Sequence, residues 1–161
     1  MNWFFVSLFF HLIGVGMIFT LLFAGPIIEA NFRWENDVRA KVHAAKLLRN
    51  IGLLSPFGAL VLILSGIGNM ITLNITIWDL FGKAWWLALK LLIFIALLIM
   101  GMVISPKTAK ARAMLLDQLN QLNPPEDANS QLSVLNSRQT GLFIMNWVLV
   151  LVIILLTIIK P

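Results

Sequence analysis

The sequence contains no cysteine, and only 12% of its 161 residues are charged. Without cysteine, disulfides and thiolate metal sites are excluded. An ordinary soluble domain has about 25% charged and about 45–50% apolar residues. Here 60% of the residues are hydrophobic and the mean hydropathy is +0.91. The composition therefore excludes an ordinary soluble domain and predicts an integral membrane protein.

The hydrophobic residues fall into long runs. A helix needs about 20 mostly apolar residues to cross a bilayer, and the runs that reach this length are residues 3–28, 51–75, 84–105 and 141–159. They must be helices, because lipid offers the backbone no hydrogen-bond partners and so few spans cannot close a barrel. No Lys or Arg precedes the first run and no small-residue cleavage pattern follows it, so we expect a mature helix there rather than a signal peptide. The predicted fold is all-α, a polytopic four-helix membrane bundle forming a single domain over residues 1–161.

The positive charges are unevenly distributed. Most of the Lys and Arg residues lie in the predicted connections 29–50 and 106–140: Arg33, Arg39, Lys41, Lys46, Arg49, Lys107, Lys110, Arg112 and Arg138. Because loops rich in Lys and Arg stay in the cytoplasm, we expect both termini on the outer side. The same cations would meet anionic lipid head groups, and we expect no nucleic-acid partner.

The two cytoplasmic connections have helical patterns of their own. From about Asp37 one face is apolar, so the second span is expected to begin as a cytoplasmic helix that Pro56 kinks. A second amphipathic stretch, with Leu115, Leu119 and Leu122, ends at Pro124 and Pro125, and its apolar face should lie on the membrane surface or on the bundle. We expect disorder at 126–130, which is acidic and polar.

Polar residues inside spans are costly and mark candidate functional sites. His11 lies about 12 Å into the first span, and Lys90 about 9 Å into the third by the helical rise. Asn69 lies at a comparable depth in the second span. Three helices are thus predicted to place polar groups in one layer of the outer leaflet, with the fourth helix closing the side.

Each residue also has a simpler interpretation. His11 could be an interhelical hydrogen-bond donor, Lys90 could extend to the outer interface, and Asn69 could hold helices together. Small residues such as Gly14, on the same face as His11, allow either close helix approach or room for a ligand. The sequence leaves these alternatives open.

Two short motifs carry a family resemblance: Phe10-His11-Leu12-Ile13-Gly14-Val15 early in the first span, and Trp86-Leu-Ala-Leu-Lys90-Leu91 opening the third. Arg49 followed by Pro56 and the ending Ile-Ile-Lys160-Pro161 accompany them. Together they resemble the HemJ-type protoporphyrinogen oxidases and the wider group of small four-helix membrane proteins that includes the CopD-like copper-resistance domains.

The resemblance implies a haem b protein of the bacterial inner membrane. In it His11 ligates the iron and Lys90 is the second essential polar residue, pairing a propionate or the carboxylates of a porphyrin substrate. We expect the cofactor site to comprise His11, Lys90, Asn69, Gly14 and Trp86. His43 falls some 20 Å or more from His11 by the helical rise, so it is expected to be solvated and not a second iron ligand.

The sequence also departs from the family. Where the HemJ fourth helix opens with Asn-Glu-x-Pro, this chain has Arg138-Gln-Thr-Gly141, and the further histidines expected around the third helix are replaced by Met100-Gly-Met-Val-Ile-Ser105. Haem binding is expected to tolerate these losses better than oxidase activity.

Two other classes of function stay open. Methionine and histidine suit Cu(I), which would make the chain a copper-handling membrane protein. Met17 and Met70 do not obviously converge with His11, however, and Met100 and Met102 lie near the inner end of the third span. A compact hydrophobic bundle is also typical of a non-catalytic accessory subunit, present as a homo-oligomer or within a larger membrane complex.

Overall fold

The computed structural model describes residues 2–119 and 125–159, and the ordered elements within them are helical. The order along the chain is α1 (Trp3–Trp34), α2 (Val38–Gly52), α3 (Leu54–Thr72), the 3₁₀ helix η1 (Trp78–Phe81), α4 (Trp85–Ile99), the π-helix η2 (Met100–Ile104), α5 (Ser105–Leu119) and α6 (Ala128–Ile158). Four helical stretches, called rods below, are long and apolar enough to cross a membrane: Trp3–Trp34, Val38–Thr72, Trp85–Leu119 and Ala128–Ile158. The second rod joins α2 and α3, and the third joins α4, η2 and α5. The predicted four-helix membrane bundle is confirmed, and the chain is a multi-pass membrane protein.

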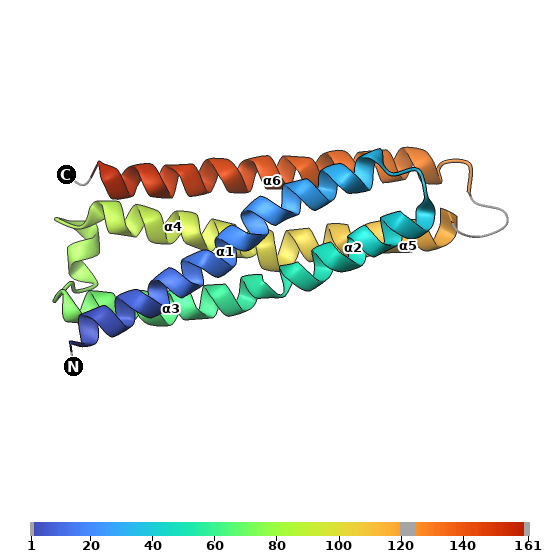
Figure 1. The fold of residues 1–161 in the computed structure, drawn as a ribbon. Helices are drawn as coiled ribbons and strands as arrows, with labels where there is room; N and C mark the ends of the chain where they lie inside the picture. The colour runs from blue at the N-terminus through green and yellow to red at the C-terminus, as the bar shows by residue number, and fades with distance from the viewer. Residues whose placement is uncertain (1, 120–124, 160–161) are drawn as a thin grey trace.

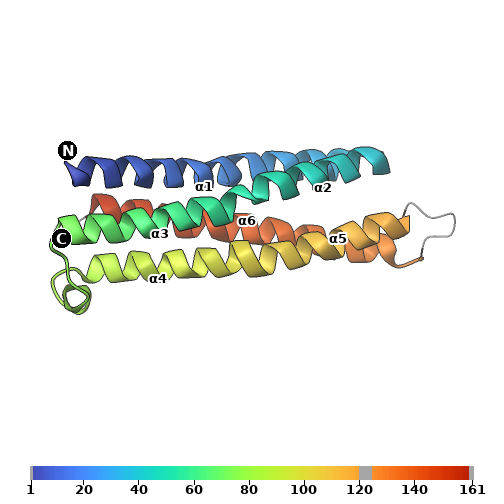
Figure 2. The ribbon, with the colours of Figure 1, turned by 90° about the horizontal axis from the view of Figure 1, so that it is seen from below.

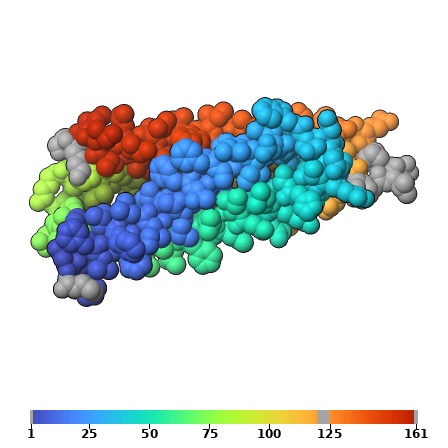
Figure 3. Space-filling model, in the orientation of Figure 1, coloured from blue at the N-terminus to red at the C-terminus, as the bar shows by residue number. Residues whose placement is uncertain are grey.

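The rods run side by side, and both termini lie at one end of the bundle (Figure 1). We call this the outer end and the opposite one the inner end, following the orientation that the charges predict. Helix α1 crosses the bundle diagonally: it packs on α3 at the outer end and reaches α6 at the inner end (Figures 1 and 3). Seen from below, α1, α2 and α3 lie on one side, and α4 and α5 form one continuous rod on the other (Figure 2).

The rods are longer than the sequence indicated. Helix α1 has 32 residues, or about 48 Å at 1.5 Å per residue, against a hydrocarbon core of about 30 Å. The predicted connections 29–50 and 106–140 are therefore mostly helical extensions of the spans. The cytoplasmic helix expected from Asp37 is present as α2, and the Asp37 side chain caps it by accepting from the backbone N–H of Arg39 at 3.1 Å.

The prediction of disorder at 126–130 was wrong. Residues 128–130 form the first turn of α6, and Ala128 is only 1% exposed. Asp127 holds this turn: its backbone carbonyl accepts from Ser130 Oγ at 2.7 Å, and its carboxylate accepts from Gln131 Nε2 at 2.6 Å. Local hydrogen bonding and burial of one small side chain outweigh the acidic composition. Leu122 and Pro124 lie outside the described residues.

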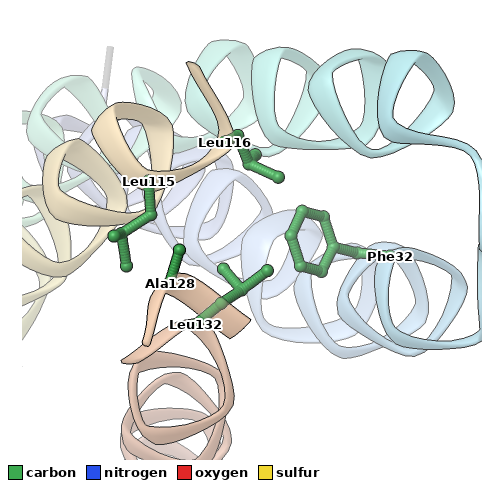
Figure 4. Close-up of a cluster of buried hydrophobic side chains, with 5 residues drawn as sticks. All are labelled: Phe32, Leu115, Leu116, Ala128 and Leu132. Carbon is green, nitrogen blue, oxygen red and sulfur yellow. The ribbon is translucent and has the colours of Figure 1, made fainter. Parts of the chain in front are cut away.

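The most buried apolar cluster lies at the inner end and consists of Phe32, Leu115, Leu116, Ala128 and Leu132 (Figure 4). It joins α1, α5 and α6, and Val42, Ala44 and Ala45 of α2 pack against it. The amphipathic stretch containing Leu115 therefore turns its apolar face to the bundle and not to the membrane surface. Outside the bilayer this face must be covered by protein, since burying apolar area is what stabilises a structure in water.

The kink expected from Pro56 takes the form of a break at Leu53, between α2 and α3. Proline has no N–H to donate, and its ring clashes with the carbonyl four residues earlier, which here belongs to Gly52. The helix therefore ends at Gly52 and restarts, so that α2 and α3 share one rod with an interruption.

A proline also interrupts α1, and a side chain from α6 compensates for it. Pro26 lies inside α1 and cannot donate to the carbonyl of Leu22. Trp147 Nε1 donates to this carbonyl at 3.1 Å, and the Trp147 ring meets Phe23 edge-on with ring centroids 4.8 Å apart. The position of Trp147 within the span follows from this orphaned carbonyl.

We therefore expect Trp147→Phe to destabilise the protein by about 1–3 kcal/mol, because a buried carbonyl loses its donor. In a Pro26→Ala background, the new backbone N–H at position 26 can donate to the Leu22 carbonyl, and the same substitution should cost much less. Thermal unfolding in detergent of the two single variants and the double variant measures the difference. An equal cost of Trp147→Phe in both backgrounds would contradict the pairing.

Candidate functional site

The outer half of α1 lies unusually close to α3. Their register is fixed by three pairs of neighbours: Ser7 with Gly68, His11 with Ser65, and Gly14 with Gly58. A Cβ atom added to Gly14 would lie 2.9 Å from Leu62 Cγ and 3.1 Å from the carbonyl oxygen of Gly58. Of the two uses that the sequence left open for Gly14, the structure shows close helix approach, which is typical of small residues in membrane helices.

This close approach brings His11 to a serine on α3. His11 Nδ1 lies 3.0 Å from Ser65 Oγ, and Ser65 is buried. The Ser65 hydroxyl donates its one hydrogen to the carbonyl of Val61 at 2.6 Å. Since Ser65 Oγ is then an acceptor, His11 must donate to it from Nδ1. This network places a proton on Nδ1, and in the neutral imidazole the lone pair then lies on Nε2.

A second bond reinforces the pair one turn farther out. Ser7 Oγ donates to the carbonyl of Ser65 at 2.8 Å. Both bonds to Ser65 come from α1, so the turn of α3 around this residue is fixed on the histidine side of the interface. No residue in the described ranges offers His11 Nε2 a hydrogen bond.

Asn69 lies one turn beyond Ser65 on α3. Its Oδ1 is buried and has no hydrogen-bond partner among the described residues. A buried amide oxygen without a donor costs about 1–3 kcal/mol. The described residues therefore include no donor across the interface for Asn69 Oδ1.

Lys90 and Trp86 come from the third rod. Lys90 Nζ lies 4.5 Å from the centroid of the Trp86 ring, one turn earlier on α4. A cation over an indole face is attracted by the ring quadrupole. The Trp86 ring therefore keeps the Lys90 ammonium group close to α4. Helix α4 packs mainly on α6 and η1. The structure thus brings His11, Ser65 and Asn69 together across α1 and α3, and it places the Lys90–Trp86 pair on a different rod.

Other metal ligands do not gather around His11. Among residues 2–119 and 125–159, no three His, Asp or Glu side chains are grouped as for a metal ion. Met17, the nearest candidate along α1, packs on Gly58, about 9 Å from His11 by the helical rise. His43 is exposed and lines a groove between α2 and α5, as expected for a solvated residue.

The sequence analysis missed a second polar centre, an ion pair at the inner end. Arg112 donates to both oxygens of Glu29, with Nη1 to Oε2 at 2.7 Å and Nη2 to Oε1 at 3.2 Å. Glu29 is 3% and Arg112 4% exposed. The guanidinium also lies 4.0 Å from the centroid of the Phe32 ring, and Arg33 Nε donates to Glu29 Oε1 at 3.3 Å. This bidentate pair joins α1 to α5.

A signal for the pair was present in the sequence. Glu29 lies one turn before Arg33 and three residues before a large aromatic, at a point where α1 continues without a break. Assigning 29–50 and 106–140 to loops hid the fact that Glu29 and Arg112 both lie on packed helix faces.

The comparisons with known proteins identify no relative. No protein family matches the sequence, nor does any curated protein or solved structure.

The contact at Gly14 allows a matched test of the site's framework. Gly14→Ala should destabilise the protein by about 1–3 kcal/mol, because the new methyl group overfills the contact with Leu62 and Gly58. Gly16→Ala, two residues along, meets no heavy atom within 4 Å and should leave the stability unchanged or slightly raised. Thermal unfolding in detergent compares the two, and an equal effect of both substitutions would refute the close approach of α1 and α3.

Proposed function

We propose that this chain is a haem b-binding protein of the bacterial inner membrane, of the HemJ/CopD-like type, acting in electron transfer or porphyrin oxidation. The proposal combines the resemblance of the His-x-x-Gly and Trp-x-x-x-Lys motifs with one observation. His11 is held by Ser65 through Nδ1, which leaves Nε2 as a metal-binding nitrogen.

The orientation of His11 carries the proposal. Histidines that bind metals almost always donate their other ring N–H to a neighbouring acceptor, which fixes the tautomer and makes the ligating nitrogen more basic. Ser65 is this acceptor, and its own hydroxyl is committed to Val61. The same bond joins α1 to α3, and metal binding at Nε2 is the further role that we propose for His11.

Two further polar groups support the proposal. The unpartnered Oδ1 of Asn69 lies on the turn of α3 next to Ser65, where it can accept from a protonated carboxyl group or from a porphyrin N–H. The Lys90 ammonium lies over Trp86 on α4, and we assign it to a propionate or a substrate carboxylate. A charge-assisted hydrogen bond of this kind is stronger in a low-dielectric environment than in water.

Haem, when bound, would supply one-electron redox chemistry, whose potential depends on the axial ligand and on burial. The chain's own part is to fix His11 Nε2, to exclude water from the apolar middle of the bundle and to present Lys90 near the outer interface. Among the described residues, His11 and Lys90 are the ionisable side chains within the outer halves of the spans.

The visible spectrum tests haem binding. Protein purified in detergent from haem-replete cells should show a Soret band, and His11→Ala should abolish it because the iron loses its protein ligand. Ser65→Ala should keep the band but weaken or shift it, since Nδ1 then loses its acceptor. The natural control is His43→Ala, which should leave the spectrum unchanged.

Colourless wild-type protein would remove the haem proposal, as would a Soret band that survives His11→Ala in protein that is monodisperse by gel filtration. The reaction is tested separately in a strain that lacks protoporphyrinogen oxidase. Growth restored by the wild-type chain and lost with Lys90→Ala supports porphyrin oxidation, whereas bound haem without complementation points to electron transfer.

A further inference from the structure

Buried polar atoms without partners collect around the ion pair at the inner end. Among the described residues, the buried side-chain atoms that make no hydrogen bond are Asn69 Oδ1, Arg112 Nε, Asn136 Oδ1, Gln139 Oε1 and Asn146 Oδ1. All but Asn69 belong to α5 and α6. Gln139 is itself only 3% exposed, so its amide oxygen cannot turn outward to bulk solvent.

The three amides share one stripe of α6. Asn136, Gln139 and Asn146 follow helical spacing and lie on the same face as the buried residues Leu132, Phe143 and Val150. Side chains three, four and seven apart project on the same side of a helix. The packed face of this membrane helix therefore carries a row of acceptors where apolar residues would be expected.

Contacts with α1 show how far along the bundle each amide of this row lies. Three pairs of neighbours fix the register between the antiparallel helices: Arg33 with Asn136, Gly25 with Phe143, and Leu22 with Trp147. Glu29 must then lie opposite the turn that contains Gln139. Asn146, next to Trp147, lies about 10 Å farther toward the outer end by the helical rise.

The row therefore starts beside the Glu29–Arg112 pair and extends into the membrane. Trp3 begins α1 at the outer end, so Leu22 is about 28 Å from it along the helix. That distance is close to the hydrocarbon thickness of about 30 Å. Asn146 lies near the inner boundary of the hydrocarbon, and Gln139, Asn136 and Arg112 lie at head-group depth or beyond, where water is abundant.

We propose that ordered water molecules bind the unpaired atoms of this row: Arg112 Nε and the amide oxygens of Asn136, Gln139 and Asn146. Each unpaired buried group would otherwise cost about 1–3 kcal/mol, and groups of this kind in native proteins are nearly always paired with protein or with ordered water. The partners suit water on both sides: Arg112 Nε donates and the amide oxygens accept. A buried water needs two to four such polar neighbours.

The hydrated row sets the inner limit of the dry part of the bundle. Asn146 lies level with Leu22, and His11 lies about 16 Å from Leu22 along α1 by the helical rise. Only this middle segment then separates inner water from the outer polar layer. The inference concerns α5 and α6 and does not depend on haem binding.

Because the sequence contains no cysteine, a cysteine introduced by substitution is the one thiol that a reagent can modify. Single variants Gln139→Cys and Asn146→Cys report on the row, and Met145→Cys is the matched control, because Met145 is adjacent to Asn146 but 51% exposed on the opposite, lipid-facing side. Each is reconstituted in sealed vesicles and treated with a small, charged methanethiosulfonate reagent from either side. Labelling is read by mass spectrometry, and gel filtration confirms that each variant is folded.

Both row positions should react from the inner side at least about tenfold faster than Met145→Cys, because the reactive thiolate forms in water and is suppressed in apolar surroundings. Labelling of either folded row variant at that rate, from the inner side alone, supports the proposal. Row positions that react no faster than Met145→Cys, or that react from the outer side, overturn it.

Discussion

The contact between Gly14 of α1 and Gly58 of α3 is the constraint on which the candidate site depends. Without a Cβ on either residue, the two backbones approach until Leu62 and Met17 fill the remaining space. Only at this separation does the short Ser65 side chain, one and a half to two turns farther out along α3, meet His11 Nδ1 at 3.0 Å. Helix packing in lipid relies on such close contacts, since lipid is as apolar as leucine and provides no hydrophobic force between helices.

The inner half of the bundle is held together by polar and aromatic contacts instead of close glycine packing. There α1 leaves α3 and meets α5 and α6, and its contacts are an ion pair, an aromatic ring and a hydrogen bond to an orphaned carbonyl. Glu29 and Arg112 are almost fully removed from solvent, where losing one partner of a pair typically costs about 3–5 kcal/mol. Pro26 lies at the change of partner, and Trp147 makes up for the missing hydrogen bond. The diagonal path of α1 thus connects an outer half that is packed through glycines to an inner half that is held by a buried ion pair.

The sequence predicted the spans well, because hydrophobic length is a strong constraint in a bilayer. It predicted α2 from Asp37 and the interruption near Pro56. It underestimated the helices at 29–34 and 128–140, since some of the contacts that hold them, such as Arg112 with Glu29, join residues distant in the chain. Helical periodicity shows that a residue faces the interior of the bundle. It does not show which residue of another helix it contacts.

The same limit applied to the candidate site. The depths of His11, Asn69 and Lys90 could be counted along the helices, and Gly14 could be placed on the face of His11. Ser65 appeared only as one small residue on a stripe, and its role became evident from its two hydrogen bonds. The pairing of Lys90 with Trp86 follows from their one-turn spacing, whereas the placing of their rod against α6 depends on contacts that no local pattern encodes.

The most direct test of this account is the ¹⁵N spectrum of His11 in lipid bilayers by solid-state NMR. With His43→Gln the chain has a single histidine, so its two ring nitrogens can be assigned without ambiguity in haem-free protein. The structure predicts a proton on Nδ1, correlated with Ser65, and a bare Nε2. A proton on Nε2 with Nδ1 unprotonated would contradict the contact that orients the histidine, and with it the proposed role as a metal ligand.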